Sequence, residues 1–144
     1  MPGTKQVLID ADALVGLINQ SDALHSRSLR IVRFLAKNNL ATIVLPSTIL
    51  EAATALSRGI KRPDLTKELL TDYSRLEPAE LPSEIFSNLL KIYNPTETTK
   101  NTPFDYFLLA YARIKQIDFV FSFDRFYEKQ GLTLAEKLCA SDTP

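Results

Sequence analysis

Acidic residues stand at the points of this 144-residue chain where hydrophobic segments end. Asp10 directly follows Val7-Leu8-Ile9, and Asp124 follows the mostly apolar stretch 117–123. Consecutive branched apolar residues are typical of a strand buried on both faces, as in a parallel sheet. In open sheets of this kind, ligands bind beyond the carboxyl ends of the strands. Both aspartates are therefore candidate site residues.

Two further acids lie in the first turns of expected helices. Glu51 is about one turn into a helix that directly follows an expected strand. Asp105 is the third residue of a long, almost wholly apolar helix that begins with Thr102-Pro103. Such a helix is expected to be buried, and a buried carboxylate needs a partner because its charge is costly to desolvate. In a parallel doubly wound sheet, all four acids would converge on one crevice.

Each acid also has an ordinary structural explanation. An aspartate at position 10, 105 or 124 could cap a helix, because its side chain accepts hydrogen bonds from free backbone N–H groups. Glu51 is favoured in a first helical turn by the helix dipole. What these explanations leave open is the joint placement, since carboxylates that share a site repel one another unless a proton or a cation neutralises them.

The chemistry that fits this cluster is metal-assisted hydrolysis. Oxygen ligands without histidine or cysteine select hard cations, here Mg²⁺ or Mn²⁺. The chain has one histidine and one cysteine, Cys139, which argues against a zinc site and against an internal disulfide. Because such cations orient water and stabilise charge on phosphate, phosphodiester hydrolysis is the natural reaction. No Ser-His or Cys-His arrangement points to a covalent nucleophile.

The composition indicates one globular domain over residues 1–144, with a frayed tail from about residue 140. Seventeen Lys and Arg residues balance seventeen Asp and Glu residues, so no global field attracts nucleic acid. Any contact with nucleic acid must then be local, and the candidates for it are Arg58, Lys61 and Arg62. No apolar run reaches membrane-spanning length, and we expect a cytoplasmic protein.

Strands are expected to alternate with helices along the chain. The expected strands cover 7–9, 42–45 and 117–123, with a weak strand over 76–81 interrupted by Pro78 and an edge strand over 132–134. Helical spacing covers about 11–18, 23–38, 46–56, 65–73, 82–93, 103–112 and 125–129. This order predicts a three-layer α/β/α sandwich with a central, mostly parallel sheet of four to five strands.

The segments around the four acids resemble the acidic motifs of PIN-domain ribonucleases. These segments are Val7-Leu8-Ile9-Asp10-Ala11-Asp12, Ser47-Thr48-Ile49-Leu50-Glu51, Phe104-Asp105-Tyr106 and Ser122-Phe123-Asp124. The resemblance covers nearly the whole chain, and its specificity comes from the order and spacing of the acids. A compact domain of this length is similar to VapC-type toxins of toxin–antitoxin pairs, which are usually homodimers held inactive by a cognate antitoxin. The resemblance implies a PIN-like fold and an endoribonuclease that uses Mg²⁺ or Mn²⁺.

The resemblance also implies a role for each acid. Asp10 and Asp105 would be the principal metal ligands, and Glu51 and Asp124 would complete the acidic cluster and help to orient water. Ser122 matches a small hydroxyl residue that often precedes the last acid and could position water or substrate.

The chain departs from the family pattern at two positions. Asp12 stands where the family often has Ser, Thr or Asn, and we expect its extra charge to alter metal binding, with a possible role in positioning water or substrate. Phe126 stands where the family often has a further acid, so Asp124 alone remains in the fourth motif.

Two other functions fit parts of the sequence. Ile9-Asp10-Ala11-Asp12 also resembles the DxD start of haloacid-dehalogenase-type phosphatases, with Asp10 as nucleophile and Asp12 as general acid. The late paired acids of that family are missing from Ser122-Phe123-Asp124-Arg125. The chain could also be a non-catalytic PIN-fold module that binds a partner or RNA, although the presence of all four acids argues against this.

Overall fold

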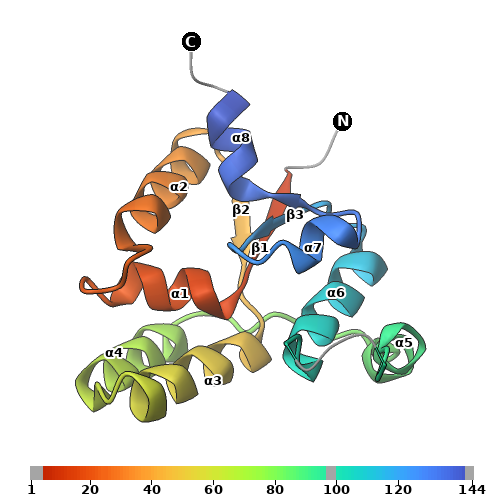
Figure 1. Cartoon of the computed structure of the whole chain (residues 1–144), viewed down its shortest axis with the longest axis horizontal. Coiled ribbons are helices and arrows are strands. Elements are labelled where there is room, and N and C mark those ends of the chain that lie inside the picture. Colours follow the sequence, from red (N-terminus) through yellow and green to blue (C-terminus); the bar gives the residue numbers. More distant parts are fainter. Residues whose placement is uncertain (1–4, 97–99, 142–144) are drawn as a thin grey trace.

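A four-stranded parallel sheet forms the centre of the computed structural model, which describes residues 5–96 and 100–141 (Figure 1). The strands lie in the order β2-β1-β3-β4. Their bounds are β1 Gln6–Ile9, β2 Ala41–Ile43, β3 Phe119–Phe121 and β4 Thr133–Leu134. Val7 on the central strand β1 is in register with Thr42 and Phe119. The predicted number and direction of strands are confirmed.

Helices connect and cover the strands. They are α1 Ala11–Ile18, α2 His25–Lys37, α3 Pro46–Thr54, α4 Pro63–Ser74, α5 Ile85–Ile92, α6 Pro103–Lys115, α7 Phe126–Lys129 and α8 Ala135–Ser141, with a π-helical turn η1 Ala55–Gly59 after α3. Proline opens α3, α4 and α6, because its missing N–H has no partner in a first turn anyway. Helix α8 reaches Ser141, and residues 142–144 of the expected tail lie outside the described residues.

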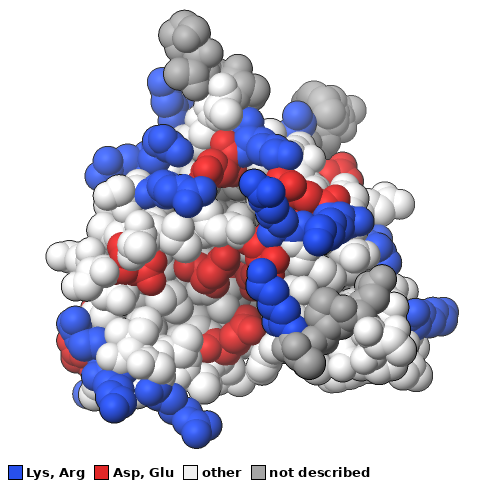
Figure 2. Space-filling model, viewed as in Figure 1, with Lys and Arg blue, Asp and Glu red and all other residues white. Residues whose placement is uncertain are grey.

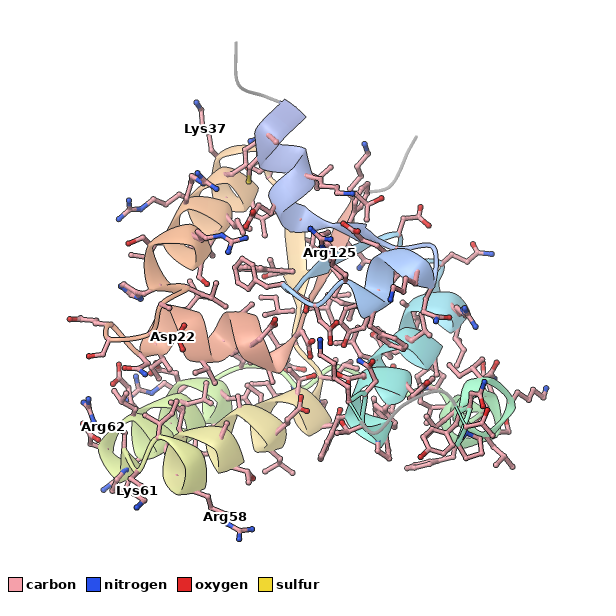
Figure 3. The ribbon with its side chains drawn as sticks, in the orientation of Figure 1. Asp22, Lys37, Arg58, Lys61, Arg62 and Arg125 are labelled. Carbon is pink, nitrogen blue, oxygen red and sulfur yellow. The ribbon has the colours of Figure 1, made fainter. Side chains whose placement is uncertain are left out.

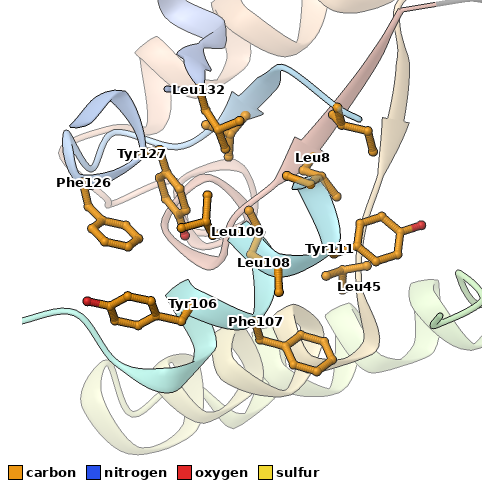
Figure 4. Packing of buried hydrophobic residues seen from close by; sticks show 14 of the residues in the cluster. Leu8, Leu45, Tyr106, Phe107, Leu108, Leu109, Tyr111, Phe126, Tyr127 and Leu132 are labelled. Carbon is orange, nitrogen blue, oxygen red and sulfur yellow. The ribbon is translucent and has the colours of Figure 1, made fainter. Parts of the chain in front are cut away.

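Alternate side chains of β1 face opposite layers of helices. Val7 and Ile9 pack with Ile31 and Leu35 of α2 and with the start of α8. Leu8 faces the other way and packs in a cluster with α6, α7 and the start of α5 (Figure 4). Helices α1, α2 and α8 therefore cover one face and α5 and α6 the other, which confirms the predicted three-layer sandwich.

A separate apolar cluster fixes α3 and α4 against α1. Val15 of α1 packs there with Ile49 and Ala52 of α3 and with Leu65 and Leu69 of α4. Because α1 starts directly after β1 and α3 starts shortly after β2, this cluster holds both helix beginnings at the carboxyl edge of the sheet.

The predicted strand over 76–81 is wrong, because the structure has no strand between Ser74 and Ile85. Pro78 and Pro82 have no N–H to donate to a sheet. Leu76 and Leu81 are 62% and 43% exposed, so the segment has no buried face either. Strand β3 is also shorter than the predicted 117–123, and the residues after Phe121 form a loop that carries Asp124.

Helix α5 carries an apolar surface that the rest of the chain leaves open. Phe86 and Leu90 are 69% and 79% exposed. A groove of about 340 Å³ lies there, lined by Phe86, Leu89, Leu90, Tyr93 and Pro103. In the described ranges, 5–96 and 100–141, no helix is long and apolar enough to cross a membrane.

Candidate active site

Asp10 lies where β1 ends and α1 begins, and it is only 6% exposed. Its Oδ1 accepts a hydrogen bond from the backbone N–H of Ala11 at 2.8 Å. Its Oδ2 accepts bonds from the hydroxyl groups of Ser122, at 3.1 Å, and Tyr127, at 2.9 Å. Asp10 is thus both the helix cap and a member of the polar cluster, so the two interpretations of this residue are compatible.

Asp105 is fixed by the beginning of α6. Its Oδ2 accepts from the backbone N–H of Thr102 at 2.8 Å, and the Thr102 side chain bonds back, which completes a capping box. Its Oδ1 lies 3.3 Å from the hydroxyl of Tyr127. The Tyr127 side chain is fully buried in the hydrophobic cluster (Figure 4), so its hydroxyl bridges Asp10 and Asp105 from the interior of the protein. Since a hydroxyl has one proton, Tyr127 donates to one of the two carboxylates at a time.

Asn101 connects Asp105 with Asp124. Its Nδ2 donates to Asp124 Oδ2 at 3.1 Å and lies 3.4 Å from Asp105 Oδ2. The other oxygen of Asp124 accepts from the N–H of Phe126 at 2.9 Å, and the Asp124 N–H donates to Ser122 Oγ at 3.1 Å. The contacts close a ring in the order Asp10, Tyr127, Asp105, Asn101, Asp124 and Ser122. Tyr127, Asn101 and the Ser122 hydroxyl donate to carboxylates, whereas the link from Asp124 to Ser122 is a backbone N–H that donates to the Ser122 hydroxyl oxygen.

Asp12 anchors the loop after β3. Its Oδ1 accepts from the Ala13 N–H at 2.8 Å, and its Oδ2 accepts from the Phe123 N–H at 2.8 Å and faces the Ser122 hydroxyl at 3.2 Å. Both oxygens of Asp12 are thus engaged by the protein itself. This arrangement does not favour the general-acid role that the phosphatase alternative requires of Asp12.

The pKa values of Asp10, Asp12 and Glu51 are raised by burial and by the charges of neighbouring acids. Burial raises the pKa of Asp10 to about 7, and the charges of Asp12 and Asp105 add to this effect. Burial likewise raises the pKa of Glu51 to about 8, with contributions from Asp10, Asp105 and Asp12. The pKa of Asp12 is raised by burial and by the charge of Asp124, although hydrogen bonds oppose the shift. Five acids therefore interact electrostatically, and no lysine or arginine is among the causes of these shifts.

Tyr127 remains a hydrogen-bond donor in this environment. Burial and the neighbouring charges of Asp10 and Asp105 raise the pKa of its hydroxyl far above the ordinary value, since ionisation would add a further negative charge. The protonated hydroxyl is the form that stabilises the two carboxylates.

The chemistry of these side chains fits a hard divalent cation. Carboxylate oxygens are the ligands that Mg²⁺ and Mn²⁺ prefer, and a cation would relieve the repulsion that raises the pKa values. Across the described segments, however, no group of three Asp, Glu, His or Cys side chains is arranged as a ready metal site. In the ring, the Tyr127 hydroxyl and the Asn101 amide lie between the acids.

The predicted acids gather in one place, whereas the predicted RNA-binding residues do not join them. Acidic side chains lie together near the centre of the face shown in Figure 2. Arg58, Lys61 and Arg62 lie at the far end of α3 and α4 from Arg125 (Figure 3), and Arg62 is paired with Asp64 at 2.8 Å. Ser122 is 1% exposed, so it contacts the acids from the protein side.

Two members of the ring, Tyr127 and Asn101, were not predicted from the sequence. Tyr127 lies in a segment rich in aromatic residues, where a core position is the ordinary interpretation. Asn101 lies in a polar stretch before α6. The only signal for Asn101 is its position immediately before the Thr102-Pro103 helix start that carries Asp105.

Comparisons with known proteins identify the fold. No protein-family model matches the sequence, and no curated protein matches it. The fold is a PIN-like α/β/α sandwich. Among solved structures it is similar to VapC20 of Mycobacterium tuberculosis, a sarcin-ricin loop cleaving toxin, with a TM-score of 0.73, 16% identity, and coverage of 88% of this chain and 96% of that chain. It is also similar to VapBC2 of Rickettsia felis bound to a DNA fragment from its promoter, with a TM-score of 0.63, 16% identity, and coverage of 90% and 96%. The chain therefore has the fold of VapC20 over nearly its whole length.

Proposed function

We propose that this protein is a divalent-metal-dependent endoribonuclease and the toxin of a type II toxin–antitoxin pair. The observation that carries the proposal is the convergence of Asp10 and Asp105 on the buried Tyr127 hydroxyl, with Glu51 close enough for its pKa to be raised by the charges of both. These acids lie in a fold that is shared with VapC20, an RNA-cleaving toxin. An acidic cluster of this kind repels an approaching phosphate unless a bound cation neutralises the charge of the carboxylates.

The proposed roles follow from how each acid is held. Asp10 and Asp105, which share the Tyr127 hydroxyl, would be the principal ligands of Mg²⁺ or Mn²⁺, and Glu51 and Asp124 would complete the cluster. The bound cation would supply activation of water and stabilisation of charge on the phosphate. Glu51, which interacts electrostatically with Asp10 and Asp105, would help to orient the attacking water.

In this proposal the substrate is RNA, and the partners are a cognate antitoxin and a second copy of the chain. The protein would act in the cytoplasm. The balance of seventeen positive and seventeen negative residues supports weak attraction for generic RNA. Recognition would then depend on the shape of a loop, as is usual for sequence-specific recognition of RNA.

The test is the cleavage of total cellular RNA by the purified protein with Mg²⁺, with Mn²⁺ and with excess EDTA. Asp10→Asn and Asp105→Asn are the informative variants, because asparagine keeps an oxygen that can accept the capping N–H bonds. The wild type is expected to cleave only with metal, and each variant is expected to lose activity by more than about 100-fold.

Asp72→Asn is the matched control, since Asp72 is exposed on α4. It is expected to cleave as the wild type does. Full activity in EDTA, or unchanged activity of the Asp10 variant, would contradict the proposal. A wild type that cleaves nothing but binds RNA or a protein, with binding insensitive to Asp10→Asn, would establish the binding module instead.

A further inference from the structure

A cavity of about 860 Å³ adjoins the acid cluster. Asn101 and Asp124 belong to its wall, and so do three basic residues, Lys100, Arg125 and Lys129. Basic side chains border the central acids in Figure 2, and Arg125 is labelled in Figure 3. The volume lies in the range of protein pockets that hold small ligands, about 300–1,000 Å³.

The three basic side chains of the cavity are available to an external anion. Over residues 5–96 and 100–141, ion pairs join Arg27 with Glu136, Arg62 with Asp64 and Lys137 with Glu128, and none of them involves a basic residue of this cavity. All three cavity residues are exposed.

One end of the cavity lies next to the acid cluster. Asn101 lines the cavity and, through its amide, bonds the carboxylates of Asp105 and Asp124. A chain that occupies the cavity therefore leaves it beside the acid cluster. A polyanion needs such local positive charge, because the acids repel phosphate and the protein as a whole is neutral.

We propose that this cavity binds the backbone phosphates of a single-stranded RNA segment next to the bond that is cleaved, with Lys100, Arg125 and Lys129 as the phosphate ligands. The inference rests on the proposed nuclease function and specifies how the substrate reaches its site. In this proposal the RNA approaches the acids through the cavity and not along the surface around Arg58, Lys61 and Arg62.

The experiment measures the affinity of the protein for a fluorescent single-stranded RNA by anisotropy, in excess EDTA so that metal-dependent cleavage does not interfere. The triple variant Lys100→Gln, Arg125→Gln and Lys129→Gln is expected to bind on the order of tenfold more weakly at low salt. Its plot of log affinity against log salt is expected to be shallower by about 0.7 for each lost phosphate contact, and by about 2 in all.

The matched control is the triple variant Lys37→Gln, Arg58→Gln and Lys61→Gln. It changes the net charge equally at positions that Figure 3 shows far from Arg125. Its affinity and salt slope are expected to equal those of the wild type. Arg125→Gln alone, with an expected loss of about 0.7 in slope, guards against a folding defect of the triple variant.

Several results would overturn the inference. These are a wild type that does not bind the RNA, a cavity variant that binds as the wild type does, and an equal loss in the control variant, which would indicate diffuse attraction. A cavity variant that keeps its RNA affinity but loses affinity for a poly-glutamate peptide would assign the cavity to an acidic protein segment.

Cleavage of RNA by the wild type with Mg²⁺ is measured in parallel, so that the two proposals can fail separately. Cleavage together with unchanged RNA affinity of the cavity variant overturns the cavity alone. Absence of cleavage together with the expected loss of affinity overturns the nuclease and leaves the cavity as an RNA-binding site.

Discussion

The hydroxyl of Tyr127 is the feature that joins the two principal acids. It lies 2.9 Å from Asp10 Oδ2 and 3.3 Å from Asp105 Oδ1 in a position without solvent contact. A phenylalanine would fill the same core space, since the ring packs in the cluster shared with α6. The hydroxyl therefore forms hydrogen bonds with the carboxylates, while the ring contributes to the packing of the core.

Tyr127→Phe is expected to weaken Mn²⁺ binding about tenfold while the fold is retained, because residues that orient metal ligands typically contribute 10- to 100-fold to affinity. Isothermal titration calorimetry measures the affinity, and the melting temperature reports the fold. Tyr111→Phe, at another buried tyrosine of the same cluster, is the control and should bind as the wild type does. Equal metal affinity in Tyr127→Phe would show that the bridge has no part in the site.

Asp10 makes the metal-free protein less stable as pH rises. Its pKa is about 7 in the folded protein against 3.8 for an ordinary aspartate, so between these values the folded state holds a proton that the unfolded state releases. The free energy of unfolding should fall from about pH 4 to about pH 7. Asp10→Asn removes the titration and, in EDTA at about pH 8, should stabilise the protein by on the order of 2–4 kcal/mol.

Urea unfolding near pH 3 and at about pH 8, in EDTA, checks this prediction. Near pH 3 the variant and the wild type should be about equally stable, because Asp10 is then mostly neutral in both states. Asp72→Asn, on the surface of α4, should change little at either pH. A variant that is less stable than the wild type at about pH 8 would contradict the claim that ionised Asp10 destabilises the metal-free protein.

The sequence predicts the acids of the site better than the groups that hold them. Asp10 and Asp124 follow apolar runs and Asp105 follows Thr-Pro, so strand and helix signals locate them. Tyr127 carries no such signal, because its hydroxyl meets Asp10 only through a contact 117 residues apart. The effect expected of Asp12 has a physical basis, since its charge is the second cause of the raised pKa of Asp10.

Among the elements, α1 and α2 approach each other most closely at Gly16. A Cβ on Gly16 would lie 2.5 Å from Ser28 Oγ and 3.4 Å from Ser28 Cβ. Ser28 is fully buried, and its hydroxyl has no hydrogen-bond partner among the described residues. The close contact between α1 and α2 thus explains why α1 contains a glycine at position 16.

Gly16→Ala is expected to destabilise the protein by about 1–3 kcal/mol, because the added methyl group overpacks the helix contact. In a Ser28→Ala background the penalty should become smaller, since the 2.5 Å contact with Oγ is removed and only the contacts at 3.4 Å and 3.6 Å remain. A double-mutant cycle of urea unfolding measures this coupling. Gly59→Ala is the control, because no atom lies within 4 Å of a Cβ there. Additive effects of the two substitutions would contradict the close approach.

Element positions are predictable where capping signals and apolar runs agree. Thr102, Pro103 and Asp105 predict the start of α6, which the structure confirms with a complete capping box. Over 76–81 the apolar residues Leu76 and Leu81 imitate a strand, but neither side chain is buried and Pro78 interrupts the donors. Local pattern alone cannot tell an exposed connection from an edge strand, because burial is decided by the rest of the fold.

At the scale of the whole molecule, the sandwich brings together acids that lie far apart in the chain. Parallel strands end at one edge, so Asp10 and the loop after β3 meet there, and the α1, α3 and α4 cluster adds Glu51. The neutral net charge conceals a strong local separation, with acids at the centre of one face and basic residues around it (Figure 2).

A bound divalent ion should reverse the pH dependence of stability. Metal binding requires ionised carboxylates, so it strengthens as pH rises, whereas the metal-free protein becomes less stable. At a Mg²⁺ concentration of about 100 times the dissociation constant the stabilisation is about 2.7 kcal/mol. Melting temperatures of the wild type should therefore rise with pH in excess Mg²⁺ and fall in EDTA. Parallel curves in both buffers would contradict the coupling of metal binding to these acids.

The measurement that tests the central claim most directly is a calorimetric titration of Mn²⁺ into the wild type, Asp10→Asn, Asp105→Asn and the control Asp72→Asn, at about pH 7.5. The account predicts saturable binding by the wild type and the control and its loss in both site variants, each of which still unfolds cooperatively. Absence of binding in the wild type, or equal binding by Asp10→Asn, would contradict the assignment of the acid cluster as a metal-dependent catalytic site.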